Sequence, residues 1–271
     1  MIENAAQWRA GGIWEVAKPQ VRNVVRSKWL LSYVAFFLLA TEGLLRFTGG
    51  GEKTLLSLAS IVLFVVPLIT VVYGTIYLYN SREFIELLLA QPLKRRRVFA
   101  GLYAGLSIPL VIAFVAGVVT PFLLRGMIFE DPRALATVIA GGSALTLTFT
   151  GIAFCLALRF EDRLTGLGAG MAIWLVLALA YDGAVLFIVA LMSDHSIEKW
   201  LLAVSLLNPI DLVRIALLLQ FDISALLGYT GAVFNRFFSG AMGLAVITAA
   251  LTTWIAGPLA LGYVGFKRKD F

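Results

Sequence analysis

The sequence is poor in cysteine, histidine and charge. Its 271 residues contain one cysteine (Cys155), one histidine (His195) and 14% charged residues. A single cysteine excludes a disulfide within the chain. One thiol and one imidazole are too few for a zinc or copper site of the usual ligand type, so we expect no metal site and no cofactor in this chain. No pairing of a nucleophile with a base stands out, and no catalytic residue is predicted.

A nucleotide site is also lacking. Residues 49–54 read GGGEKT, which resembles a phosphate-binding loop. A Walker A loop needs glycine immediately before its lysine, and Glu52 stands there instead of glycine. We therefore interpret this segment as a flexible turn. Any ATP-driven work by this chain would require a partner subunit.

Long hydrophobic runs are what the sequence has in abundance. Hydrophobic residues make up 60% of the chain, and its mean hydropathy is +0.91. A helix needs about 20 apolar residues to cross the hydrocarbon core of a bilayer. Six runs are long enough, and none alternates as barrel strands do: 29–45, 55–79, 98–124, 134–158, 164–192 and 240–263. The sequence thus predicts an all-α polytopic protein in the lipid bilayer, with a cytoplasmic segment at 1–28 and one six-helix transmembrane domain at 29–271.

The basic residues indicate the orientation of these spans. The segments 1–28, 80–97, 159–163 and 264–271 fall on one side and hold 15 of the 22 lysines and arginines. By the positive-inside rule this side is cytoplasmic, which places both chain ends in the cytoplasm. The basic pI near 9.6 is explained in this way without a nucleic-acid partner.

Two amphipathic segments flank the spans on the cytoplasmic side. Residues 20–28 predict an interfacial helix that begins at Pro19, with Val21, Val24 and Val25 on its apolar face. Between spans two and three, Asn80 is spaced to cap a second helix, which Pro92 ends. Arg82, Glu83 and Glu86 would form its polar face, and Phe84, Ile85 and Leu88 its apolar face. This helix could rest on lipid headgroups or bind a cytosolic partner.

The outer segment 193–239 contains two short apolar helices. Residues 200–207 are too few to span, and Asn208-Pro209-Ile210-Asp211 restarts a helix with a cap and a proline at its first position. Asp211 and Arg214 lie three residues apart, close enough to pair. The pattern predicts a re-entrant hairpin between spans five and six, and an ordinary surface loop is the alternative. Re-entrant backbone is tolerated at membrane depth only where protein buries it.

Two further groups of charged residues lie in or near the spans. Asp182 falls in the middle of span five, where a charge costs about 2.5–3.5 kcal/mol and must face protein or water. It could serve gating or helix packing. Glu42 and Arg46 lie four residues apart near the outer end of span one and can pair.

The order of these parts resembles the ABC-2 type permeases, the membrane subunits of one class of ATP-binding-cassette transporters. The stretches that carry the resemblance are Val66-Pro67-Leu68-Ile69, Gln91-Pro92-Leu93, Tyr181-Asp182 and Leu206-Leu207-Asn208-Pro209-Ile210-Asp211. The similarity runs from about Ile13 to the C-terminus and is strongest to permeases of nitrous oxide reductase maturation. It departs at Lys18-Pro19-Gln20, where the family usually has Lys-Glu-Leu, and residues 1–12 look like an extension.

The resemblance implies a set of partners and a site. It implies two copies of the chain in the bacterial inner membrane, a cytosolic ABC ATPase dimer, and a periplasmic accessory protein that delivers copper-site components. The helix at 81–91 would be the coupling helix, with Arg82, Glu83, Phe84, Ile85 and Glu86 seated in the ATPase. The outer hairpin would carry Asn208, Pro209, Asp211 and Arg214.

Three other functions are compatible with parts of this pattern. Within the superfamily, the chain could export a lipid, a polysaccharide or a peptide. From other classes, it could be an intramembrane enzyme or a secondary transporter. A secondary transporter should show inverted repeats with interrupted spans at matched positions, and none pair convincingly. An intramembrane hydrolase needs two polar groups at membrane depth, and only Asp182 qualifies.

Overall fold

The computed structural model describes residues 13–48, 50–127, 130–191, 204–220 and 241–269, and every regular element within them is a helix. Six helical segments are long and apolar enough to cross a membrane. They are α3 (Lys28–Phe47), α4 (Gly51–Asn80), α6 (Arg95–Leu124), α7 (Pro132–Arg159), a composite helix of α8 (Arg163–Leu175), η2 (Val176–Ala180) and α9 (Tyr181–Leu191), and α13 (Ala241–Arg268). The predicted all-α fold with six spans is confirmed.

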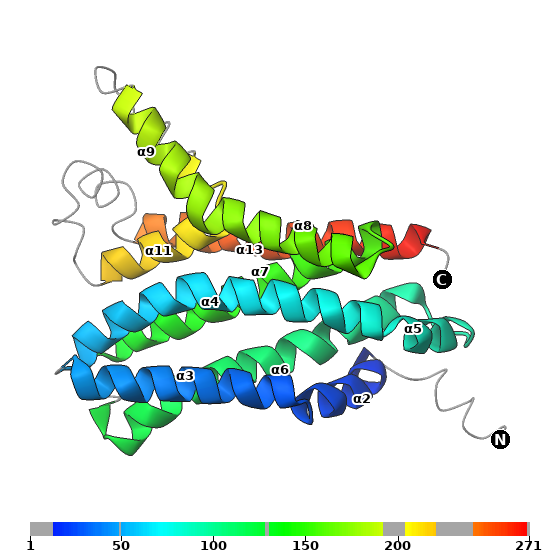
Figure 1. The fold of residues 1–271 in the computed structure, drawn as a ribbon, viewed down its shortest axis with the longest axis horizontal. Coiled ribbons are helices and arrows are strands. Elements are labelled where there is room, and N and C mark those ends of the chain that lie inside the picture. Colours follow the sequence, from blue (N-terminus) through cyan, green and yellow to red (C-terminus); the bar gives the residue numbers. More distant parts are fainter. Residues whose placement is uncertain (1–12, 49, 128–129, 192–203, 221–240, 270–271) are drawn as a thin grey trace.

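Three shorter helices complete the described fold: α2 (Ile13–Val25), α5 (Arg82–Leu89) and α11 (Pro209–Gln220). The spans form an elongated bundle (Figure 1). At one end lie α2, α5 and the last turn of α13, and at the other lie the connections from α3 to α4 and from α6 to α7. This separation agrees with the alternation of basic and less basic loops along the sequence.

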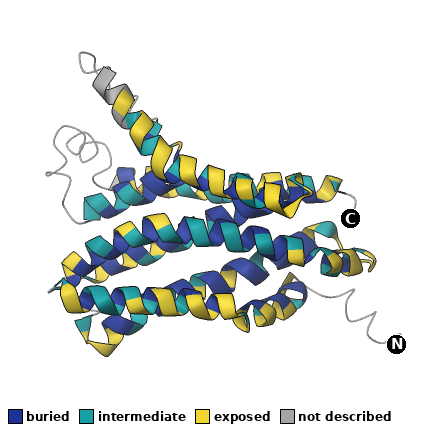
Figure 2. Cartoon of the chain, viewed as in Figure 1, coloured by how far each residue is buried: buried dark blue, intermediate teal, exposed yellow. Residues whose placement is uncertain are grey.

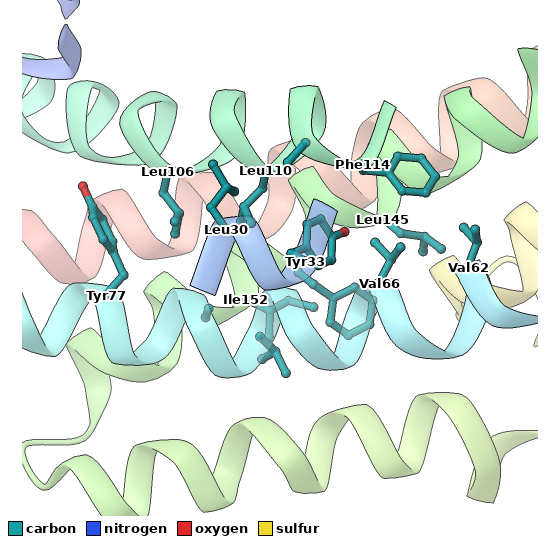
Figure 3. Close-up of a cluster of buried hydrophobic side chains, with 14 of the residues drawn as sticks. Leu30, Tyr33, Val62, Val66, Tyr77, Leu106, Leu110, Phe114, Leu145 and Ile152 are labelled. Atoms are coloured by element: carbon teal, nitrogen blue, oxygen red, sulfur yellow. The ribbon is translucent and has the colours of Figure 1, made fainter. Parts of the chain in front are cut away.

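The core of the bundle is built around α7. Within its 18-residue apolar stretch, 67% of the residues are buried inside the protein, compared with 6% for the corresponding stretch of α13. Leu145 of α7, Phe114 of α6 and Val62 of α4 meet in this core and are fully buried (Figure 3). The close approach of α7 to α6 requires Gly142, because a Cβ at that position would overlap the Phe114 ring. The outer faces are apolar but exposed (Figure 2), with Trp29, Leu39 and Leu261 each more than 60% exposed, as expected of surfaces that face lipid.

The ion pair predicted near the outer end of span one is confirmed. Arg46 Nε lies 2.9 Å from Glu42 Oε1. The same carboxylate also binds Arg125, whose Nη2 lies 2.6 Å from Oε1. Glu42 therefore joins the C-terminal ends of α3 and α6.

Three local predictions are wrong. Pro19 lies inside α2, six residues after its start, and does not open the helix. Helix α4 already begins at Gly51, so the expected flexible turn at 49–54 is mostly helical. Asn80 does not cap α5. The cap position is held by Ser81, whose hydroxyl donates to the Tyr77 carbonyl 2.8 Å away, while Asn80 accepts from Arg163.

Helix α2 packs on the chain itself, along α6. Val16, Ala17, Gln20 and Val24 are buried, while Val25, expected on the apolar face, is half exposed. Gly105 of α6 makes room for Gln20, whose Oε1 accepts a hydrogen bond from the Tyr77 hydroxyl at 2.8 Å. The location of α2 at the membrane surface stays a prediction.

Candidate functional site

The amphipathic helix α5 projects one exposed edge from the end of the bundle that also holds α2 and the last turn of α13. Ile85 is fully buried and Leu88 is 5% exposed, so the apolar face packs on the chain's own core. Phe84 is half-buried and packs against the same core. Glu83, Glu86 and Leu87 are exposed. The helix therefore offers a narrow acidic edge to a neighbour, while Ile85 supports it from inside.

Arg82 fixes the start of α5 to the loop between α7 and α8. Its Nη2 donates to the carbonyl oxygens of Phe160 and Glu161 at 3.3 and 3.0 Å. The guanidinium also lies over the Tyr79 ring, 4.5 Å from its centroid. The Tyr79 hydroxyl in turn donates to Phe160 O at 2.9 Å. The sequence places Arg82 on the polar face of α5, and the structure turns that side chain toward its own chain.

The next helix along this loop begins with a side-chain cap. Asp162 Oδ2 accepts from the backbone N–H of Thr165 at 2.8 Å and from its hydroxyl at 2.8 Å. These hydrogen bonds hold the pKa of Asp162 below its ordinary value. The carboxylate is thus ionised at neutral pH. The cap also fixes the start of span five close to the loop that Arg82 of α5 binds.

Away from α5, Asn208 joins α11 to span five. Its Oδ1 accepts from the backbone N–H of Ile210 at 3.0 Å, which confirms the predicted cap. Its Nδ2 donates to Leu177 O at 2.8 Å. Leu177 lies in η2, a single π-helical turn in which hydrogen bonds skip one residue more than in an α-helix. Asn208 is fully buried, so both of its polar atoms have partners within the protein.

Asp182 and the predicted Asp211–Arg214 pair form one ionic cluster. Arg214 Nη1 lies 2.8 Å from Asp211 Oδ1 and 2.8 Å from Asp182 Oδ2. The side chains of Arg214 and Asp182 are about one-third exposed, and that of Asp211 is 12% exposed. The Asp211–Arg214 pairing is confirmed. The sequence gave no reason to connect Asp182 with it, because 32 residues separate Asp182 from Arg214.

Helix α11 is buried on almost every side. Pro209, Ile210, Leu212 and Val213 lie in the interior. Val213 fits against Gly141 of α7, where a Cβ would overlap its Cγ1. The Tyr181 hydroxyl donates to Val204 O, and Trp254 Nε1 of α13 donates to Leu206 O at 3.0 Å. Protein thus buries most of the first two turns of α11. The re-entrant path itself stays a prediction, because residues 192–203, which include half of its first arm at 200–207, lie outside the described residues.

Comparison with known proteins identifies the family. The family model described as "ABC-2 family transporter protein" matches residues 14–271. The chain belongs to the ABC-2 transporter family. It is 27% identical over 276 residues to the probable ABC transporter permease protein NosY of Pseudomonas aeruginosa, and 26% identical over 278 residues to that of Stutzerimonas stutzeri. Each alignment covers 95% of this chain and 98% of the relative.

Membership in the ABC-2 family decides between the classes of function left open by the sequence. Such a permease is the non-enzymatic membrane subunit of an ABC transporter, and membership implies association with an ABC ATPase. An intramembrane enzyme and a secondary transporter are thereby disfavoured. Export of a lipid, polysaccharide or peptide stays an alternative within the family.

Sequence reasoning missed several residues that hold the ABC-2 fold together. Tyr79, Arg95 and Trp254 each donate to backbone carbonyls more than 45 residues away. A backbone carbonyl has no identity in the sequence, so no residue pairing could reveal these contacts. The π-helical turn likewise has no sequence signal, since residues 176–180 read VLALA like the apolar helix around them.

Proposed function

We propose that this chain is the membrane half of an inner-membrane ABC transporter whose cytosolic ATPase binds the exposed edge of α5. Two copies of the chain would assemble with an ATPase dimer, and both chain ends would lie in the cytoplasm. The ATPase would supply all the chemistry, and this chain would supply movement. Glu83, Phe84 and Glu86 are the residues proposed to meet the ATPase, with Arg82 and Ile85 holding the helix in place from behind.

The attachment of α5 to the rest of the bundle is the observation that carries the proposal. The helix is only eight residues long, and an isolated helix of that length is not stable in water. Here its buried side rests on the core through Ile85 and Leu88, and Arg82 ties its first residue to the loop after α7. A force on the exposed edge would therefore reach the spans without first bending the helix.

ATP-driven closure of the ATPase dimer would displace α5 and shift the bundle between two arrangements. The outer segment that contains α11 would move in response, and this movement would be the readout on the periplasmic side. Following the sequence resemblance and the two NosY relatives, we propose that the readout serves copper-site maturation of nitrous oxide reductase, through a periplasmic accessory protein.

The direct test reverses the charge of the exposed edge. The variant Glu83→Lys/Glu86→Lys should weaken binding of the ATPase, because the edge would meet its partner with the wrong sign. Co-purification of the ATPase encoded with the permease, and the rate of ATP hydrolysis by the complex, measure the effect. Since both side chains are exposed, membrane insertion should not change.

Glu52→Lys is the matched control. Glu52 is also an exposed glutamate, and it lies at the opposite end of the bundle, in the first turn of α4. This variant should bind the ATPase like the wild type. Stoichiometric ATPase with normal hydrolysis in the double reversal would show that α5 is not the coupling helix.

A further inference from the structure

The end of the last span is held by an arginine from another helix. Arg95, the first residue of α6, donates from Nη1 to the carbonyl oxygens of Phe266, Lys267 and Lys269 at 3.2, 2.9 and 2.9 Å. The last carbonyls of a helix lack partners within it. A cation at that end also meets the negative pole of the helix dipole. Arg95 thus caps α13 from outside.

This attachment adds to the packing of α13 on α7, in which Cys155 Sγ donates to Pro258 O at 2.9 Å and Gly151 lies against Pro258. Within the 18-residue apolar stretch of α13, 6% of the residues are buried. Besides Arg95, the described contacts at its cytoplasmic end include Lys269 Nζ, which donates to Leu158 O of α7 at 3.1 Å, and the buried ring of Phe266 against Phe99. The position of α13 therefore depends on its packing along α7 and on these attachments near its end.

Arg95 also lies close in sequence to the coupling helix. Helix α5 ends at Leu89, and five residues separate it from Arg95. The first turn of α6 would therefore follow a displacement of α5 over a short connection. The guanidinium would pass this displacement to the end of α13.

At its other end α13 reaches the outer segment. Trp254 lies 14 residues before Arg268, or about 21 Å along an α-helix at 1.5 Å per residue. Its Nε1 donates to Leu206 O at 3.0 Å, two residues before the cap Asn208. One continuous helix thus joins Arg95, at the start of α6, to the segment that precedes α11 (Figure 1).

We propose that Arg95 is a positioning residue through which the coupling helix moves α13, and that α13 transmits this movement to the outer segment by way of Trp254. The inference rests on the proposed function, because it requires an ATPase that displaces α5. A rival route runs from Arg82 through the loop at 160–162 into span five. That route crosses the π-helical turn at 176–180, and the route through α13 passes Pro258, which lacks a backbone N–H. Each path therefore contains one interruption of regular α-helical hydrogen bonding.

The test measures movement of the outer segment directly in the permease–ATPase complex. Leu207 is 63% exposed and follows the carbonyl that Trp254 binds. In a Cys155→Ser background, Leu207→Cys provides the chain's single thiol. Its rate of labelling by a membrane-impermeant maleimide is compared with and without a non-hydrolysable ATP analogue. We expect Arg95→Gln to reduce the ATP-dependent change in rate about 5-fold or more, with ATPase co-purification unchanged.

Three variants complete the design. Arg96→Gln removes an exposed arginine from the same turn and should leave the ATP-dependent change intact. Arg95→Lys retains a cation that can bond a carbonyl and should restore part of it. Lys269→Gln removes the hydrogen bond from Lys269 Nζ to Leu158 O at the same helix end. It should reduce the ATP-dependent change as Arg95→Gln does, so the inference stays testable even where Arg95→Gln fails to assemble.

The outcomes separate the two proposals. If the ATPase does not bind the unaltered permease, the proposed function fails. If the ATPase binds but Leu207→Cys labelling ignores nucleotide, or if it responds equally in Arg95→Gln, only the transmission through α13 fails. Loss of the response in Arg82→Gln with retention in Arg95→Gln would assign transmission to the rival route.

Discussion

Arg214 is the residue on which the outer ionic cluster depends. Both Asp182 and Asp211 reach it through the same nitrogen, Nη1. Arg214→Gln would leave two carboxylates without their cation, whereas Asp182→Asn would leave Arg214 paired with Asp211. We therefore expect Arg214→Gln to lower the unfolding free energy by about 1–3 kcal/mol, discounted for partial exposure, and Asp182→Asn by less. Thermal unfolding in nanodiscs measures both.

The same variants decide the role of Asp182. A packing role predicts that Asp182→Asn keeps transport-linked activity, because the amide oxygen still accepts from Arg214. A gating role predicts loss of activity with normal assembly. Stabilities of the two single variants that add fully in the double variant Asp182→Asn/Arg214→Gln would contradict the shared cluster, since residues in contact are expected to couple.

Asn208 makes two bonds that can be separated by substitution. Asn208→Ser keeps an oxygen able to cap α11 but is too short to reach Leu177 O. Asn208→Ala loses both bonds. We expect a loss of about 1 kcal/mol for each bond, so the serine variant should fall midway between wild type and alanine. Equal stability of all three, by the same unfolding assay, would show that Asn208 does not fasten α11 to span five.

Among the helices, α11 and α7 fit together through one small residue. Gly141→Ala should push α11 away from α7, because the new Cβ would overlap Val213 Cγ1. Overpacking of this kind costs about 1–3 kcal/mol. The double variant Gly141→Ala/Val213→Ala should recover part of the loss, since the methyl groups in conflict are gone. An unaltered melting temperature in Gly141→Ala would mean that this contact is not tight.

The elements themselves are predictable to different degrees from sequence. The six spans follow from hydrophobic length alone, and the observed helices extend at most five residues beyond the expected ends where both are described. The start of α2 and the cap of α5 are not predictable in this way. Pro19 lies inside α2, and the Asn80 side chain accepts a hydrogen bond from Arg163 of α8. In both cases the local signal does not set the helix boundary, since α2 begins six residues before Pro19 and Asn80 is the last residue of α4.

The site is less predictable than the fold for the same reason. The Asp211–Arg214 pair and the Asn208 cap are local, and both are confirmed. The attachments of Asn208 to Leu177, of Arg82 to Phe160 and of Arg95 to Phe266 all end on backbone carbonyls of distant residues. The side-chain sequence carries no trace of such acceptors, which become visible only when the helices are in place.

For the whole molecule, the distribution of charge predicts the orientation in the membrane. Reporter tags at residues 1 and 271 should both be cytoplasmic, and a tag near Asp194 should be periplasmic, because 15 of the 22 basic residues fall on one side. Compartment-specific fusion activity in intact cells measures each position. A periplasmic tag at residue 271 would be incompatible with six spans and with α5 facing a cytosolic ATPase.

The π-helical turn in span five gives that span a built-in change of phase. Each residue of an α-helix turns the chain by about 100°, and a π turn accommodates one extra residue. Everything after residue 180 is therefore rotated relative to an uninterrupted helix, and this rotation directs Asp182 toward Arg214. Deleting one residue from 176–180 would preserve composition and hydropathy almost entirely, yet it would point the outer half of the span along a different azimuth.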